Sequence, residues 1–293
     1  MAIIEKSSWS RKFIGFLMRW YRKSFLYPWA GKSLAHLLAA FMPQSTTSSL
    51  ATIELRGVVF ELDLREVIDS SLYFSGSFEP LAEEIIANSL GAGMVAIDVG
   101  ANIGYHTLAM AQHVGSSGLV IAIEPTNYAF NKLERNLSLN DFHNVRLLRV
   151  GLSDKDYGET EVCFRSSYRL DGKDEIRNEI VPIMTLDTLV VEQGLTKIDF
   201  MKIDVDGFEA KIFAGAQESL KRFRPILFFE FSPSGIIANG GNPEEILNTL
   251  WDLGYSLQTD TREKLPRIVS AVYKTVLPGT GLINLLAISK KTT

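Results

Sequence analysis

Residues 95–107 have the sequence VAIDVGANIGYHT, which is the most informative stretch about the architecture of the chain. Met94–Val99 is a short apolar run that is typical of a buried strand. Gly100 and Gly104 then allow a tight turn, and the helical stretch Tyr105–Val114 follows. A strand that turns on glycines into a helix is the repeating unit of parallel α/β sheets, which predicts an α/β fold.

The same alternation of strands and helices continues almost to the end of the sequence. Because apolar strands are separated by helices of about ten or more residues, we expect a mostly parallel sheet with helices on both faces. Ligands bind such sheets beyond the carboxyl ends of the strands, where the strand order reverses. The expected strands are 94–99, 119–124, 145–150, 198–203, 226–231, 255–258 and 284–289, and the expected helices are 105–114, 129–139, 209–223 and 243–253. A hairpin around Arg56-Gly57 and a helix at 79–90 are expected before the sheet.

Charge is unevenly distributed along the 293 residues. Residues 1–50 carry seven Lys or Arg against one acid, so the net charge of −4 leaves −10 on the remainder. An acidic body argues against a nucleic-acid partner. The single cysteine, Cys163, excludes an intramolecular disulfide, and no run approaches the roughly 18 apolar residues of a membrane span. We therefore expect a cytoplasmic protein.

A basic leader precedes the predicted domain. Residues 11–27 form an amphipathic helical pattern, with Arg and Lys on one side and aromatic residues opposite. Two interpretations are open: the helix packs on the protein itself, or it lies on a membrane surface as a peripheral contact. With the polar segment 44–49 as a linker, we expect a leader over 1–50 and a catalytic domain over 51–293.

The glycine loop favours one kind of cofactor over another. A dinucleotide loop G-x-G-x-x-G would need glycine at positions 102 and 105, which hold Asn102 and Tyr105. Asp98 would also repel a pyrophosphate, whereas a carboxylate suits a cofactor with a cationic sulfonium and an amino group. A turn that binds no ligand is the alternative interpretation.

Two further segments fit an adenosine cofactor. Glu124 ends the second predicted strand, where a carboxylate can accept hydrogen bonds from the ribose hydroxyls, and Pro125 then ends the strand. Ser153 or Asp154, after the third strand, could meet the adenine edge. The alternatives are a solvated acid at position 124 and an ordinary turn at 153–154.

Several motifs in order make the chain resemble the FkbM-type methyltransferases, a branch of the class I S-adenosylmethionine-dependent fold. The similarity runs from about residue 71 to 231 and is carried by YFSGSFEP (73–80), AIDVGANIGYHT (96–107), AIEP (122–125), VGLSD (150–154), TLDTL (185–189), DFMKIDVDGFE (199–209), FAGA (213–216) and RPILFFEF (224–231). The resemblance implies a Rossmann-like, mostly parallel seven-stranded sheet with an antiparallel last strand. It also implies methyl transfer to an oxygen, on a sugar, glycan, lipid or secondary metabolite. Phe208 stands where the family commonly has alanine, which would reshape the acceptor pocket.

These considerations assign roles to individual residues. The residues expected to hold S-adenosylmethionine are Asp98, Gly100, Ala101, Asn102, Gly104, Tyr105, Thr107, Glu124, Pro125, Ser153, Asp154 and Asp204. The candidates for proton transfer are Asp204, Asp206, Glu209 and His106, and those for acceptor binding are Glu230 and Lys202. The structural alternatives are turn formation for Asp206, the start of a helix for Glu209 and core packing for His106. The acids could also gather Mg²⁺, but no compact ligand spacing requires it and we expect no metal.

Two other functions are compatible with the sequence. An NAD(P)-dependent oxidoreductase would share the sheet, although the loop lacks the second glycine. A non-catalytic, membrane-associated protein could also retain the fold. The acceptor is expected to be a small molecule, glycan or lipid hydroxyl, and the oligomeric state stays open.

Overall fold

The computed structural model describes residues 50–165, 169–170, 176–276 and 281–289. The predicted leader and its amphipathic segment 11–27 lie outside these ranges. The described residues divide into two compact units, one of residues 50–80, 138–140, 163–165, 169–170 and 176–177 and the other of residues 81–137, 141–162, 178–276 and 281–289. Among the described residues, no helix has both the length and the apolar character needed to cross a membrane.

The first unit contains the predicted hairpin, which is confirmed. β1 (Leu50–Leu55) pairs antiparallel with β2 (Val58–Asp63). Arg56 and Gly57 have φ of 54° and 81°. Two positive φ angles characterise the two-residue turns whose twist matches that of the strands they join.

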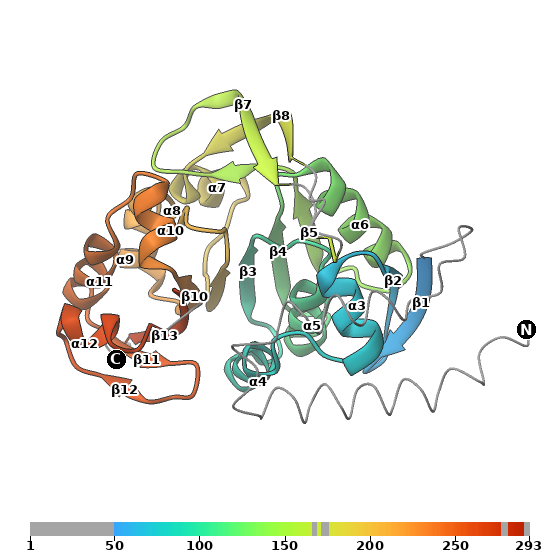
Figure 1. The fold of residues 1–293 in the computed structure, drawn as a ribbon, viewed down its shortest axis with the longest axis horizontal. Helices are drawn as coiled ribbons and strands as arrows, with labels where there is room; N and C mark the ends of the chain where they lie inside the picture. Colours follow the sequence, from blue (N-terminus) through green and yellow to red (C-terminus); the bar gives the residue numbers. More distant parts are fainter. Residues whose placement is uncertain (1–49, 166–168, 171–175, 277–280, 290–293) are drawn as a thin grey trace, which may run out of the picture. The chain divides into compact units, whose positions relative to one another are not determined.

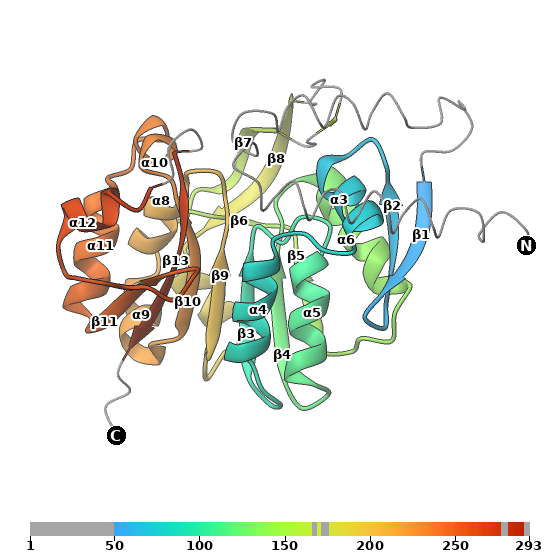
Figure 2. The same ribbon diagram turned by 60° about the horizontal axis from the view of Figure 1, so that its bottom comes forward.

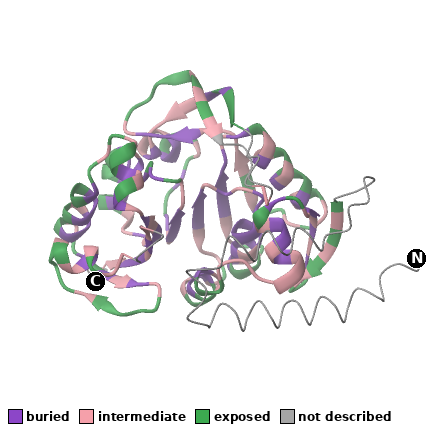
Figure 3. Cartoon of the chain, in the orientation of Figure 1, coloured by how far each residue is buried: buried purple, intermediate pink, exposed green. Residues whose placement is uncertain are grey.

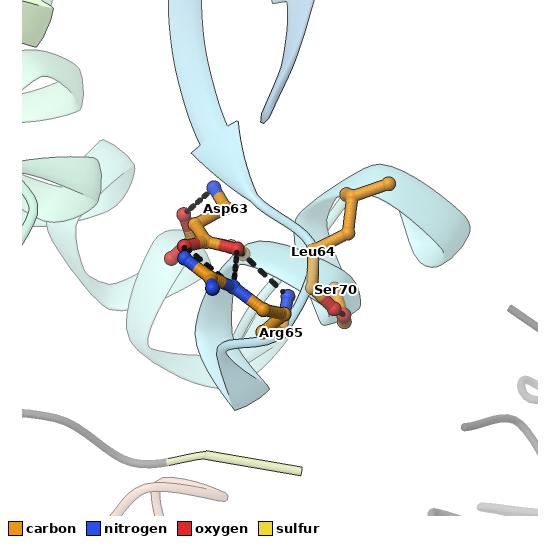
Figure 4. A network of polar contacts seen from close by, with 5 residues as sticks. Asp63, Leu64, Arg65 and Ser70 are labelled. Atoms are coloured by element: carbon orange, nitrogen blue, oxygen red, sulfur yellow. Dashed lines mark hydrogen bonds and ion pairs between the residues drawn. The ribbon is translucent and has the colours of Figure 1, made fainter. Parts of the chain in front are cut away.

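Helix α3 (Val67–Ser75) follows the hairpin, and a polar network fixes the junction. Arg65 donates through Nε and its terminal nitrogen to the carboxylate of Asp63, and Ser70 Oγ donates to Leu64 O at 2.6 Å (Figure 4). The Asp63 amide donates to Asp69 Oδ1 at 2.6 Å. The buried acids Asp63 and Asp69 therefore serve to connect the strand to the helix.

The second unit is built on an eight-stranded sheet with the order β12-β11-β13-β10-β9-β3-β4-β5 (Figures 1 and 2). β5, β4, β3, β9 and β10 are parallel, and β13 runs antiparallel to both β10 and β11. Its strands are β3 (Val95–Val99), β4 (Leu119–Ile123), β5 (Val145–Leu148), β9 (Phe200–Ile203), β10 (Ile226–Phe231), β11 (Tyr255–Thr259), β12 (Lys264–Leu265) and β13 (Ile283–Ser289). All seven predicted strands are present, and the antiparallel last strand is confirmed; the two-residue edge strand β12 is the eighth.

Alternate residues of the strands pack into two different cores, because successive side chains point to opposite faces of a sheet. Ala96 and Val120 pack with residues of α4 (Pro80–Ser89) and α5 (Tyr105–Val114). Ile97 and Ile121 pack in the larger core on the other face. That core takes residues from α7 (Leu186–Glu192), α8 (Glu209–Ala214), α9 (Gln217–Phe223) and α11 (Pro243–Asp252). The sheet is therefore covered by helices on both faces, and its central strands are buried (Figure 3).

Some elements differ from the sequence-based expectation. The predicted single helix 209–223 is wrong, because α8 ends before Gly215 and α9 begins at Gln217. The segment after β5 forms a second sheet of three strands in the order β6-β8-β7, which was not predicted. The remaining elements are α6 (Asn127–Ser138), β6 (Gly151–Leu152), β7 (Gly158–Arg165), β8 (Ile176–Met184), α10 (Pro233–Ala238) and α12 (Val269–Tyr273).

Candidate functional site

The candidate residues lie at the carboxyl ends of three neighbouring strands. The chain passes from β3 to β4 and β5 on one side, and later places β9 and β10 on the other side of β3. The strand order therefore reverses between β3 and β9, which is where α/β sheets bind ligands. Asp98 of β3 is in register with Lys202 of β9, while Glu124 and Asp204 follow the last residues of β4 and β9.

Asp98 is buried, with 1% of its surface exposed. Its Oδ2 accepts a 2.6 Å hydrogen bond from Thr107 Oγ1, which lies in α5 and is also buried. Its Oδ1 is buried too and has no hydrogen-bond partner among the described residues. Since an unsatisfied buried acceptor costs free energy, this oxygen fits a site completed by a donor from a ligand, such as an ammonium group.

The glycine loop brings backbone segments very close together. Gly100 has a φ of 81°, and a Cβ at this position would lie 1.9 Å from the carbonyl oxygen of Asp204. Gly104 has a φ of 89°, and its Cβ would lie 2.1 Å from a methyl of Leu133. Only glycine fits either position. The loop is thereby held against both the end of β9 and helix α6.

The rest of the loop is ordered by hydrogen bonds. The amides of Gly100 and Ala101 both donate to Ile123 O at 3.0 Å. Asn102 adopts a left-handed φ of 48°. Tyr105, at the start of α5, is buried and donates from its hydroxyl to Glu83 Oε1 at 2.6 Å. The ring of Tyr105 is therefore held within the protein.

Glu124 is joined directly to the glycine loop. Its Oε2 accepts from the Asn102 amide at 2.9 Å, and its Oε1 accepts from Thr126 through the amide at 3.0 Å and the hydroxyl at 2.6 Å. Burial raises the pKa of Glu124 above its usual range, against the effect of these hydrogen bonds. A carboxylate has about four lone-pair directions, so three bonds leave about one for a ligand hydroxyl. Pro125 separates Glu124 from Thr126 as the chain turns toward α6.

Ser153 and Asp154 follow β6, close to the same end of the sheet. Ser153 is buried, and its Oγ donates to Asp154 Oδ1 at 3.0 Å. Partial burial opposes the ionisation of Asp154, but hydrogen bonds from Ser153 and Tyr157 outweigh it and lower the pKa of the Asp154 carboxyl. An ionised Asp154 can accept a hydrogen bond from an exocyclic amine.

Lys202 and Asp204 form an ion pair at the end of β9. Lys202 Nζ lies 2.8 Å from Asp204 Oδ2, and the lysine side chain is 4% exposed. Burial opposes the ionisation of Asp204, but the Lys202 ammonium and, to a smaller extent, His106 hold the pKa of Asp204 below its usual range. His106 lies in the first turn of α5 and is buried. The structure thus brings Lys202, Asp204 and His106 together.

Asp206 and Glu209 have different environments although they are three residues apart. Asp206 is exposed, in a left-handed turn with a φ of 53°, and its carbonyl accepts from Asn239 Nδ2 at 3.2 Å. Glu209 is fully buried, and its Oε1 accepts from the amides of Val205 and Gly207, each at 3.2 Å. Burial raises the pKa of Glu209 to about 7. Glu209 therefore braces the loop that presents Asp206.

Comparison with known proteins identifies the family. The sequence model of the FkbM methyltransferase domain matches residues 98–257, more than half of the chain and the part that contains this site. The chain belongs to the FkbM methyltransferase family. It is accordingly an S-adenosylmethionine-dependent methyltransferase, and the family resemblance seen in the sequence is confirmed.

Individual relatives of this FkbM methyltransferase are distant. Methyltransferase sdnD of Sordaria araneosa is 27% identical over 216 residues, covering 62% of this chain and 80% of the relative. The FkbM methyltransferase of Methylobacillus flagellatus is 13% identical with a TM-score of 0.40, over 74% of this chain and 52% of that protein, so the chain spans about half its length. M. jannaschii TYW2, solved with S-adenosylmethionine, is 15% identical with a TM-score of 0.42, over 82% and 85% of the two chains.

The FkbM site has two further features at its margin. Glu230, the next-to-last residue of β10, is half-buried and in register with Asn284 of β13. Phe208 is 39% exposed, and Lys211 Nζ lies 5.3 Å from the centre of its ring. Among the described residues, no three His, Cys, Asp or Glu side chains gather as metal ligands would.

Thr126 and Glu179 are two residues of this region that were not predicted from the sequence. Thr126 binds Glu124 through two hydrogen bonds, and a threonine before a helical stretch is the pattern that could have indicated it. Glu179 accepts from the amide of Asn127 at 2.8 Å. It lies 52 residues further along the chain, in a strand that was not predicted, so no local pattern could have revealed this contact.

Proposed function

We propose that this FkbM methyltransferase transfers a methyl group to the hydroxyl oxygen of a small molecule, glycan or lipid. The observation that carries the proposal is the approach of Gly100 to Asp204, since a Cβ on the glycine would lie 1.9 Å from the Asp204 carbonyl oxygen. This contact brings the cofactor loop to the edge where the Lys202–Asp204 pair, His106 and Asp206 gather. Acidic and imidazole groups there suit an acceptor that loses a proton during transfer.

S-adenosylmethionine supplies a methyl group that is already activated toward nucleophiles. The residues of the chain then have to hold the cofactor and align the acceptor oxygen, in a site that excludes competing water. We assign Asp98 to the amino group of the methionine part, Glu124 to the ribose, and Ser153 with Asp154 to the adenine edge. The unsatisfied Oδ1 of Asp98 and the remaining acceptor direction of Glu124 support these assignments.

Asp206 is the proton acceptor that the geometry favours. It is exposed at the carboxyl edge, whereas Glu209 is fully buried and bonded to backbone amides. Asp204 is committed to Lys202, which has 4% of its side chain exposed and therefore orients Asp204 instead of meeting the acceptor. His106 is the second candidate, because it lies close enough to Asp204 to stabilise its ionised form.

The acceptor is expected to lie over Phe208. This ring is exposed two residues after Asp206, and an aromatic face can support the apolar face of a sugar or a planar metabolite. Glu230 can accept hydrogen bonds from further hydroxyls of the acceptor. The net negative charge of residues 51–293 disfavours nucleic acid as the acceptor, so a neutral or cationic acceptor fits best.

A transfer assay with tritiated methyl tests the proposal. The full chain is incubated with radiolabelled S-adenosylmethionine and fractionated metabolite, glycan and lipid extracts. O-methylation is supported if a labelled product still forms after amines and thiols have been removed from the extracts, but no longer forms after the hydroxyls of the extracts have been acetylated. The D206N and H106Q variants should then lose turnover while they bind S-adenosylhomocysteine as the wild type does. Label found only on nitrogen or carbon would overturn the hydroxyl assignment.

Peripheral membrane contact through residues 11–27 is a separate proposal that rests on the sequence pattern alone. Co-sedimentation with vesicles that contain anionic lipid tests it, with a chain lacking residues 1–50 as the comparison. Binding that depends on the leader and falls with added salt supports it. Equal sedimentation of both chains would refute it.

A further inference from the structure

Glu179 of β8 lies against the start of helix α6. It is 8% exposed, and its Oε2 accepts a 2.8 Å hydrogen bond from the amide of Asn127, the first residue of the helix. The first amides of a helix have no partner within the helix, and a carboxylate at that end is also favoured by the helix dipole. Glu179 therefore caps α6 from a different sheet.

This cap is adjacent to the segment that holds the candidate ribose ligand. Asn127 follows Thr126, and Thr126 donates two hydrogen bonds to Glu124 Oε1. The other carboxylate oxygen of Glu124 accepts from Asn102 in the glycine loop. Residues 124–127 are thus anchored at one end by the glycine loop and at the other by Glu179.

Arg149 holds Glu179 in place. Its terminal nitrogen donates to Ile180 O at 2.9 Å and lies 3.9 Å from Glu179 Oε2. Arg149 is the first residue after β5, at the carboxyl edge of the large sheet. The arginine therefore connects β8 with the same edge of the sheet from which Glu124 projects.

We propose that Glu179 is a positioning residue for the cofactor: by capping α6 it fixes the segment 124–127 and so the direction of the Glu124 carboxylate. The proposal rests on the proposed role of Glu124 in binding the ribose. It gives the three-stranded sheet a function, because β8 delivers the capping carboxylate.

Asp199 offers a matched control. Its Oδ2 accepts from the amide of Val95 at 2.9 Å, a bond of nearly the same length that also joins two segments far apart in the chain. Val95 is the first residue of β3, so this bond lies at the amino end of the strand, opposite the cofactor edge. Removing either carboxylate should lower stability, but only one removal should alter cofactor affinity.

The test measures the Kd of S-adenosylhomocysteine by calorimetry, and Tm, for the wild type, E179A, E179Q and D199A. We expect E179A to bind about fivefold more weakly, the usual scale of a lost helix cap. E179Q retains an oxygen that can accept from Asn127 and should lose about twofold. D199A should lower Tm without changing Kd. Equal Kd values for wild type, E179A and D199A, with lowered Tm in both variants, would overturn the proposal.

Two further variants keep the outcome decisive. If E179A does not fold, E179D takes its place, because it retains the charge but withdraws the carboxylate from Asn127; an unchanged Kd would overturn the proposal. In an E124A background, E179A should cause no additional loss of affinity. An additional loss as large as in the wild type would show that Glu179 does not act through Glu124. Failure of the wild type itself to bind would refute the proposed function instead.

Discussion

Thr107 Oγ1 donates a 2.6 Å hydrogen bond to Asp98 Oδ2, and both side chains are buried at the end of β3. The hydroxyl satisfies one oxygen of Asp98 and leaves the other facing no partner among the described residues. Thr107 therefore orients the carboxylate, and the second oxygen is available to a donor on the cofactor.

The D98N variant separates the charge of Asp98 from its shape. Its amide oxygen can still accept from Thr107, but the ligand now meets an uncharged group that presents N–H donors. We expect S-adenosylhomocysteine to bind about 10- to 100-fold more weakly, because a charge-assisted hydrogen bond is worth about 1.5–3 kcal/mol. Calorimetry measures this Kd. T107V is the control, since it loses stability with a smaller change in affinity; D98N binding like the wild type would contradict the assignment.

Lys202 should be needed for Asp204 rather than for the acceptor. K202M leaves Asp204 without its ammonium partner, so the pKa of the Asp204 carboxyl should rise. A carboxyl whose pKa is lower in the folded protein than in the unfolded chain stabilises the fold at pH values above its unfolded pKa. This stabilisation is lost as the pH falls through its folded pKa. Because K202M lacks the ammonium that lowers the pKa of Asp204, it should lack the part of the free energy of unfolding that the wild type loses on acidification. We expect a loss of about 1–3 kcal/mol at pH 7, less than for a fully buried pair because Asp204 is 35% exposed.

Chemical denaturation at pH 3 to 7 checks this expectation, with the double variant K202M/D204N as the control. Removing both charges avoids an unpaired carboxylate, so the double variant should be more stable than K202M. Additive losses from K202M and D204N would show that the pair contributes no coupling energy.

Glu209 should make stability depend on pH near neutrality. Its folded pKa of about 7 lies above the ordinary value of 4.5, so the folded protein retains a proton that the unfolded chain has lost between these values. The contribution of Glu209 to the free energy of unfolding should therefore fall as pH rises from about 4.5 to 7, and stay level above and below that range. The span corresponds to a change on the order of 3 kcal/mol.

The E209Q variant isolates this effect, because glutamine can accept from the Val205 and Gly207 amides but does not titrate. Urea unfolding at pH 5 and pH 8 gives the comparison. The wild type should lose stability relative to E209Q between the two pH values. A constant difference at both pH values would mean that Glu209 is ionised throughout.

Seven of the eight strands of the large sheet could be predicted, because the local sequence indicates where each begins and ends, whereas the two-residue strand β12 is too short to leave such a pattern. Val95–Val99 and Ile226–Phe231 are short apolar runs bounded by turn residues, and Tyr105–Val114 is bounded by glycines, so their limits follow from neighbouring residues. The candidate site could be placed at the carboxyl edge for the same reason. The contacts within it could not, because Asn102 with Glu124 and Glu179 with Asn127 depend on how separate segments meet.

The division of the predicted helix 209–223 has the same kind of cause. Gly215 has a φ of −85°, which any residue can adopt, so its sequence neighbours gave no reason to end a helix there. The reason is tertiary: a Cβ on Gly215 would lie 2.1 Å from the carbonyl oxygen of Ser153. Glycine at this position lets the α8–α9 corner approach the segment that follows β6.

G215A should consequently destabilise the protein, although alanine favours helices. The added methyl must displace the backbone at Ser153, and overpacking of this kind costs about 1–3 kcal/mol. G91A is the matched control, because Gly91 also avoids the left-handed region and its Cβ would make an ordinary 3.9 Å contact with Met94. That variant should be neutral or gain up to about 1 kcal/mol. Urea unfolding of both variants measures the contrast. Equal stability of G215A and G91A would show that the corner can move away from Ser153, and that this close approach does not divide the helix.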